Sequence, residues 1–182
     1  MADLTDLATV KRWLGLTSQA DDAMLSALIT SYSAYVESWL NRTFASQSYT
    51  ERVDGVGSLG IAFSNYPVTA VASVSIDDIA IPAATSTSTP GYRFSDKFLY
   101  LNGYRFTRGL QNVSITYAAG YASTPPEIKE AVTELVAYQY KSRDRIGHSS
   151  KSLAGETVSF ITSDFPANVR TILNNYKKVI PQ

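Results

Sequence analysis

The chain has 182 residues, the length of one ordinary domain or of one domain that carries an insertion. It contains no cysteine and a single histidine, His148, which excludes disulfides, thiol nucleophiles and metal sites rich in cysteine or histidine. Sixteen basic residues balance sixteen acidic ones, so no strong overall field attracts nucleic acid or an anionic membrane. Hydrophobic residues make up 45% of the chain, which indicates a packed globule, and the twelve tyrosines suit protein interfaces. No apolar run approaches the ~20 residues of a membrane span and the first residues lack a signal-peptide pattern, so we expect a soluble intracellular protein with no membrane partner.

Helix signals occupy the first part of the chain. Asp6 can cap a short helix over Leu7–Leu14, and Gly15 can end it. A longer helix is expected from about Ala20 to Asn41, because apolar residues recur there with a period close to 3.6. These residues are Leu25, Leu28, Ile29, Tyr32, Val36, Trp39 and Leu40.

The middle of the chain has the pattern of strands and turns. Asp77-Asp78 and Asn102-Gly103 are typical of tight turns, and the Ala, Ser and Thr of Ala83–Thr89 predict an exposed loop. Short β-prone runs separated by Gly, Pro, Asn and Asp predict strands. The runs are Ser48–Val53, Leu59–Phe63, Val68–Ile76, Ile79–Ile81, Tyr92–Phe94, Phe98–Leu101 and Val113–Tyr117.

Helix signals return near the end of the chain. Thr124 as the cap, Pro125 as the first helical residue and Glu127 three residues after the threonine predict a helix that ends near Arg145–Gly147. The polar stretch His148–Gly155 predicts a mobile loop. Pro166 then opens a last short helix, whose apolar stripe is Val169, Ile172, Leu173 and Tyr176.

This order of elements predicts an α+β fold. We expect a helical bundle of about four helices from both chain ends, with an inserted antiparallel β-sheet region. The expected parts are residues 1–44 with the N-terminal helices, 45–121 with the inserted sheet, and 122–182 with the C-terminal helices and tail.

No group of residues forms a convincing catalytic or cofactor site. His148 stands beside Ser149 and Ser150, but sequence neighbours rarely form a nucleophile and base, so a solvated loop is the better interpretation. Asp77-Asp78 with Asp54 or Asp96 lacks the spacing of a metal loop, and turn chemistry explains the pair. We therefore expect neither an enzyme nor a bound cofactor or metal.

Charge is distributed unevenly along the chain. Residues 1–40 carry five acids and two bases, whereas residues 141–182 carry seven bases and three acids. The basic set permits contact with nucleic acid, a solvated face that complements helix C-termini, or complementarity with an acidic surface of a neighbouring copy. The last two interpretations outweigh the first, because no recognition helix or dense basic stripe is present.

The order of these features resembles a known family. The opening DLATVKRWLGLTSQADDAMLSALITSYSAYVESWLNRTF is similar to the N-terminal helix pair of the head–tail connector (adaptor) proteins of tailed bacteriophages. Later segments, YPVTAVASVSIDD, VSITYAAGYASTPPEIKEAVTELVAYQYKSRD and FPANVRTILNNYKK, resemble the longer, β-containing members. The matching positions in the opening are Leu7, Val10, Lys11, Trp13, Leu14, Asp21, Asp22, Leu25, Leu28, Ile29, Leu40 and Arg42.

The resemblance implies a virion structural protein without enzymatic activity. Such connectors form a ring, commonly of twelve copies, beneath the portal; the ring closes the DNA-filled head and is the platform for the next neck or tail protein. The implied location is the head–tail junction of the virion, after assembly in the host cytoplasm, with DNA only as cargo that passes through the ring. The alternatives are another neck component, such as a stopper or tail-terminator ring, or a nucleic-acid-binding module.

The end of the chain is the expected portal-binding segment. It combines an aromatic residue, two bases and two aliphatic residues, which could seat in apolar grooves and meet an acidic surface. The alternative is that the stripe ending at Tyr176 only completes the helical core. The candidate residues are Tyr176, Lys177, Lys178, Val179 and Ile180.

Overall fold

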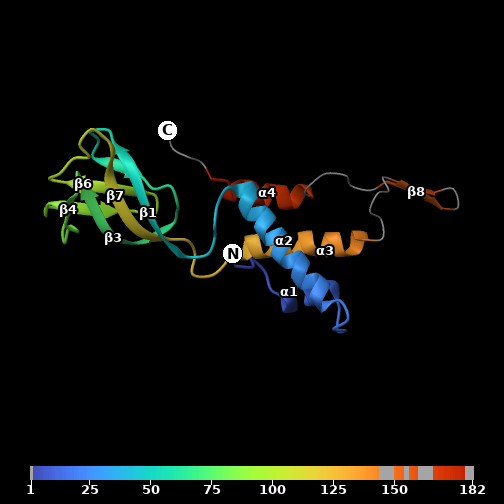
Figure 1. The fold of residues 1–182 in the computed structure, drawn as a ribbon. Helices are drawn as coiled ribbons and strands as arrows, with labels where there is room; N and C mark the ends of the chain where they lie inside the picture. The colour runs from blue at the N-terminus through green and yellow to red at the C-terminus, as the bar shows by residue number, and fades with distance from the viewer. Residues whose placement is uncertain (1, 144–149, 154–155, 160–165, 179–182) are drawn as a thin grey trace. The chain divides into compact units, whose positions relative to one another are not determined.

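A computed structural model describes residues 2–143, 150–153, 156–159 and 166–178 (Figure 1). The described chain divides into two compact units. One is formed by the chain up to Thr43 together with Ser123–Lys178, and the other by Phe44–Ala122. Helices from both chain ends pack together in the first unit and antiparallel sheets fill the second, so the predicted α+β class is confirmed.

The helical unit is built around α3. This helix packs against α1, α2 and α4, and its residues Ile128, Val132 and Leu135 are buried against them. The hydroxyl groups of Thr5 and Thr133 lie 2.7 Å apart, so these two buried polar side chains are partners. The helices are α1 (Leu7–Leu14), α2 (Asp22–Leu40), α3 (Pro126–Ser142) and α4 (Ala167–Tyr176).

Local chemistry sets the ends of the first helices, as the sequence predicts. An Asp6 carboxylate oxygen accepts a hydrogen bond from the Thr9 N–H at 2.8 Å, which caps α1. Gly15 follows α1 in the left-handed conformation with φ of 70°, where glycine has no steric penalty. The second helix is two residues shorter at its start than expected, because Asp21 rather than an earlier residue takes the cap position.

The predicted cap of α3 is wrong. Pro125, not Thr124, precedes the first helical residue, and it has φ of −53° and ψ of 136°. Because Pro125 is itself followed by Pro126, the ring of Pro126 disfavours the helical region for it. The helix therefore begins at Pro126, one residue later than the threonine signal indicates.

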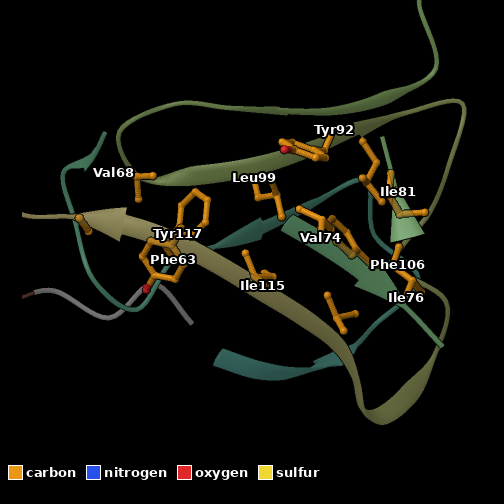
Figure 2. Packing of buried hydrophobic residues seen from close by; sticks show 13 residues of the cluster. Phe63, Val68, Val74, Ile76, Ile81, Tyr92, Leu99, Phe106, Ile115 and Tyr117 are labelled. Carbon is orange, nitrogen blue, oxygen red and sulfur yellow. The ribbon is translucent and has the colours of Figure 1, made fainter. Parts of the chain in front are cut away.

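The second unit consists of two antiparallel sheets. A four-stranded sheet has the order β1-β7-β3-β4, and a three-stranded sheet has the order β2-β6-β5. The apolar side chains of both sheets meet in one core, where Tyr117, Phe63, Leu99 and Ile115 point toward one another (Figure 2). The strands are β1 (Gln47–Gly55), β2 (Gly60–Ala62), β3 (Val68–Ile76), β4 (Ile79–Ile81), β5 (Gly91–Phe94), β6 (Phe98–Asn102) and β7 (Gly109–Ala119).

The two predicted tight turns have different outcomes. Asp77-Asp78 joins β3 to β4, and both residues have positive φ, so this turn is confirmed. Asn102-Gly103 ends β6 but forms no hairpin with the next strand, because β6 pairs with β2 and β5, whereas β7 lies in the other sheet. Gly103 turns the chain, with φ of 73°, into the connection between sheets.

The predicted loop after α3 contains a strand. Strand β8 (Ser150–Leu153) pairs antiparallel with β9 (Glu156–Ser159), so this part of His148–Gly155 is not the simple loop that its composition indicates. His148 itself, and the expected end of α3 near Arg145–Gly147, lie outside the described residues.

Candidate interaction surfaces

The expected portal-binding segment begins at the end of α4. The Tyr176 hydroxyl donates a hydrogen bond to Glu127 Oε2 at 3.1 Å, and the Tyr176 carbonyl accepts one from Arg42 Nη1 at 3.3 Å. The Lys178 N–H donates to the Leu40 carbonyl at 3.3 Å. The helical unit thus holds the chain at Tyr176–Lys178, while Val179 and Ile180 lie outside the described residues.

Lys177 is the exposed member of this segment. Its ammonium group lies over the ring of Trp39, 5.3 Å from the ring centroid. At the start of α4, the Asn168 side-chain amide donates to both carboxylate oxygens of Glu134 on α3, at 2.6 and 2.7 Å. Since Val169 and Leu173 of the predicted stripe are buried, α4 completes the helical core up to its last turn.

Several acids near the start of the chain are paired within the helical unit. Lys129 Nζ lies 2.6 Å from Asp6, and Arg143 Nη1 lies 3.9 Å from Asp21, which also accepts a hydrogen bond from the Tyr140 hydroxyl. Some acids of the N-terminal region are therefore paired with bases of the same copy. These carboxylates are less available for ion pairs with a neighbouring copy than the sequence alone indicates.

One end of the four-stranded sheet is held by a network of polar side chains. The Asp77 carboxylate accepts hydrogen bonds from the Thr107 hydroxyl at 2.6 Å and from the Asn112 amide at 3.1 Å. The Asp54 carboxylate accepts one from the Gln111 N–H at 2.6 Å. The Thr107 bond, and after it the Asn112 bond, lowers the pKa of Asp77 below its usual value. Asp54 and Asp77 thus organise loops.

The same end of the sheet exposes aliphatic side chains. Val56 is 62% exposed, Ile79 68% and Leu110 83%. Val56 and Leu110 flank an open depression, which is lined also by the Arg108 side chain. We name this surface the sheet tip: Val56, Ile79, Arg108 and Leu110. The sequence analysis missed it, although apolar residues beside turn glycines and aspartates are a signal that could have found it.

The three-stranded sheet also carries exposed aromatic side chains. Tyr100 is on its outer face beside Phe98, with ring centroids 6.0 Å apart. Its ring lies over Gly60 of the neighbouring strand, because an added Cβ there would be 3.2 Å from the ring. Exposed aromatic groups on ordered strands are typical of protein interfaces rather than of catalysis.

Two further features are absent from the described residues. Across the described ranges, no group of three or more His, Cys, Asp or Glu side chains has a metal-binding arrangement. Among the helices in those ranges, none is both long and apolar enough to cross a membrane.

A comparison with protein families decides what kind of protein has this architecture. The model of one family, described as "Head completion protein", matches residues 3–179, almost the whole chain. The chain belongs to the head completion protein family. As a member, it is a structural component of a phage-like virion and not an enzyme. The likeness to virion connector proteins noted in the sequence is thereby confirmed at this level.

Solved structures with the same fold come from gene transfer agent particles. The protein in a structure described as the virion of a native gene transfer agent particle has a TM-score of 0.62 and 16% identity, covering 98% of this chain and 92% of that one. A chain from the neck of an empty particle, computed with C6 symmetry, has a TM-score of 0.60 and 19% identity over the same shares. A third, from the neck of a native particle computed with C12 symmetry, has a TM-score of 0.58, 16% identity and coverage of 100% and 96%. No curated protein sequence matches this head completion protein.

Proposed function

We propose that this head completion protein forms a ring beneath the portal, at the neck of the particle. The ring closes the DNA-filled head, leaves a channel through which DNA passes, and is the platform for the next neck or tail protein. The observation that carries this proposal is the family match together with a shared fold over 98% or more of the chain in neck structures. Twelve copies suit both reported symmetries, since a twelvefold ring also has sixfold symmetry.

The helical unit supports an adaptor rather than a stopper or tail-terminator ring. Stopper and tail-terminator proteins of tailed phages tend to consist mainly of β-structure, whereas four helices form a separate core in this chain. A ring needs a patch on each copy that meets a different patch on the next. The helical unit and the sheet unit each expose large hydrophobic side chains that suit this use, including Trp13, Tyr35 and Leu110.

The tail after α4 is proposed as the portal-binding element. Contacts with Glu127, Arg42 and Leu40 hold Tyr176 and Lys178 on the helical unit, so the chain is anchored there up to Lys178. Lys177 is exposed beside that point and can meet an acidic portal surface. Val179 and Ile180 supply the apolar anchors.

The test separates ring formation from portal binding. The chain ending at Lys178 keeps every contact described for Tyr176 and Lys178, so its melting temperature and its ring formation should match those of the full chain. Its binding to purified portal should fall at least tenfold, since two buried aliphatic anchors are each worth roughly 1.5 kcal/mol or more. Ile79→Ser, an exposed aliphatic change in the sheet unit, is the matched control. Unchanged portal binding by the shortened chain would place the docking surface elsewhere.

A further inference from the structure

Strand β1 forms a long open edge. It is the first strand in the order β1-β7-β3-β4, and its residues Gln47–Val53 pair with β7 in one unbroken register, from Gln47↔Ala119 to Val53↔Val113. Within the described ranges, no backbone hydrogen bond reaches Gln47–Val53 from any segment other than β7. An edge of this kind offers a row of N–H and C=O groups to a further strand.

The other edges of the two sheets are guarded. Strands β2 and β4 have three residues each and β5 has four, which limits pairing with a further strand. Where β3 extends past β4, two register shifts interrupt it, and the Tyr92 hydroxyl donates to the Val71 carbonyl. By contrast, Gln47–Val53 contains neither proline nor lysine, the residues that usually block an edge.

The hairpin of β8 and β9 lacks a third strand. Its ladder runs from Ser150↔Ser159 to Leu153↔Glu156, and no further strand of the described chain joins it. A two-stranded hairpin is marginally stable on its own in water, and a third strand stabilises it. The open edge of β1 and the two-stranded hairpin therefore each need what the other supplies.

The outer face of β1 carries small hydroxyl side chains. On the solvent face of the four-stranded sheet, Thr50 of β1, Thr116 of β7 and Ser73 of β3 form one row, because Thr116 pairs with both of the others. Ser48 precedes Thr50 on the same face of β1. A strand added along β1 would continue this row across the edge.

The other face of β1 is turned toward the core. Tyr49 and Val53 pack against the core of the sheet unit, and Glu51 stands between them. The open feature of β1 is therefore its main-chain edge rather than its inner face.

We propose that the β8–β9 hairpin of one copy adds to the β1 edge of a neighbouring copy. This inference rests on the ring of the proposed function, because a ring requires a donor surface and a different acceptor surface on each copy. The partner is a second copy of this chain, and it is recognised through main-chain hydrogen bonds.

Hydrogen exchange on assembled rings tests the edge itself. In the full chain, ring formation should slow exchange in peptides covering Gln47–Val53 by roughly tenfold or more. A variant with 150–159 replaced by glycine and serine should lose this slowing. The peptide Val68–Ser73 of β3 is the internal control, and its exchange should not depend on the hairpin. Equal slowing of β1 in both proteins would overturn the proposal.

Cysteine pairing tests which copy supplies the hairpin, and the natural chain has no cysteine to interfere. One set of copies carries Ser48→Cys or Thr50→Cys, and a second, tagged set carries Ser150→Cys, Ser152→Cys, Thr157→Cys or Ser159→Cys. Mixed rings should give disulfide-linked pairs of different copies for at least one combination, because a bridge requires Cβ atoms within about 4.5 Å. Ser73→Cys, on the same face of β3, should give none with any hairpin variant.

The outcomes separate this proposal from the proposed function. Rings that form without any cross-link between copies would overturn the hairpin contact but leave the ring standing. A further variant carries both cysteines in one copy. Cross-links found only within single copies of this variant would also overturn the proposal, because the hairpin would then pair with its own β1. A wild-type chain that forms no ring on a portal would instead contradict the proposed function.

Discussion

The ammonium group of Lys129 lies 2.6 Å from the carboxylate of Asp6, so α3 is tied to the residue that caps α1. The same carboxylate accepts hydrogen bonds from the N–H and the hydroxyl of Thr9, at 2.8 and 2.9 Å. The Lys129 hydrogen bond, followed by the Thr9 N–H, holds the pKa of Asp6 at about 2, below its usual value of 3.8. Residues 123 positions apart in the chain thereby share one contact of the helical unit.

This contact predicts an acid-dependent loss of stability. The folded-state pKa of Asp6 is depressed, so its contribution is fully present above pH 3.8 and is lost as the pH falls toward 2. In Asp6→Asn the free energy of unfolding should depend less on pH across this window than in the natural chain. Asp6→Ala, which also removes the cap, should lose about 1 kcal/mol at neutral pH. Urea unfolding at several pH values measures both effects.

Asp3→Asn is the control for this prediction, because Asp3 is an exposed carboxylate close by in sequence. Its pH dependence should follow that of the natural chain. A pH profile of Asp6→Asn identical to that of the natural chain would show that the Lys129 contact is too screened by solvent to matter.

The hydroxyl of Tyr117 should matter more than that of its stacked neighbour Tyr49. Tyr117 donates to Glu51 Oε1 at 2.6 Å and accepts from the Asn65 N–H at 3.1 Å. Tyr117→Phe leaves both groups without this partner, so it should cost about 1–3 kcal/mol. The Tyr49 hydroxyl accepts a hydrogen bond from the exposed Gln47 amide, so Tyr49→Phe should cost less than about 0.5 kcal/mol. Equal losses in thermal unfolding would contradict the assignment.

Burial and the Glu51 bond raise the pKa of Tyr117, which predicts an effect at high pH as well. Above pH 10 the unfolded chain releases the phenolic proton while the folded chain keeps it, so stability should fall as the pH rises. The slope should be smaller in Tyr117→Phe than in Tyr49→Phe. Unfolding at pH 9 to 11 provides the measurement.

Gly55 should tolerate no side chain, because of its closeness to the loop before β7. A Cβ at this position would lie 1.8 Å from the Thr107 carbonyl oxygen. Gly55→Ala must therefore displace the backbone at the sheet tip, and we expect a loss of about 2–3 kcal/mol. Gly15→Ala is the matched control: its site is open, and it should lose only the 1–2 kcal/mol of a left-handed residue. Chemical shifts at Val56 and Leu110 should change only in Gly55→Ala.

Local chemistry explains which parts of the fold were predictable. The Asp6 cap, the Gly15 end and the Asp77-Asp78 turn depend on side chains within a few residues, and all three are as predicted. Thr124 failed as the cap of α3 because the two consecutive prolines shift the helix start. One residue next to the expected cap, here Pro126, is therefore enough to move the start of a helix.

Pairing between distant segments was not predictable in the same way. The runs at 98–101 and 113–117 look alike as strands, yet β6 and β7 lie in different sheets. That division depends on how two apolar faces close over one core, which no local pattern encodes. The sheet tip was missed for the same reason, because Val56, Ile79 and Leu110 come from three separate turns. The tail at Tyr176–Ile180 could be proposed from the sequence because its residues are contiguous, and it stays a prediction.

The last prediction is that the helical unit folds without the sheet. Its core is closed by residues from both chain ends, including Leu25, Val36, Val132 and Leu173, all of which lie in the same compact unit. The two points of entry into the sheet unit are adjacent, because the Tyr121 N–H donates to the Phe44 carbonyl at 2.8 Å.

A short linker can therefore replace residues 45–121 without stretching the chain. We expect the shortened protein to keep helical circular dichroism and a cooperative thermal transition. Its free energy of unfolding should be lower than that of the full chain only by the small cost of closing a flexible loop, which is roughly 1 kcal/mol for a few residues. Leu173→Ala in the shortened protein is the control, and it should lose a further 2–5 kcal/mol if the bundle has its native packing. A shortened chain with helical signal but no cooperative transition would mean that the sheet unit is needed for the bundle to pack.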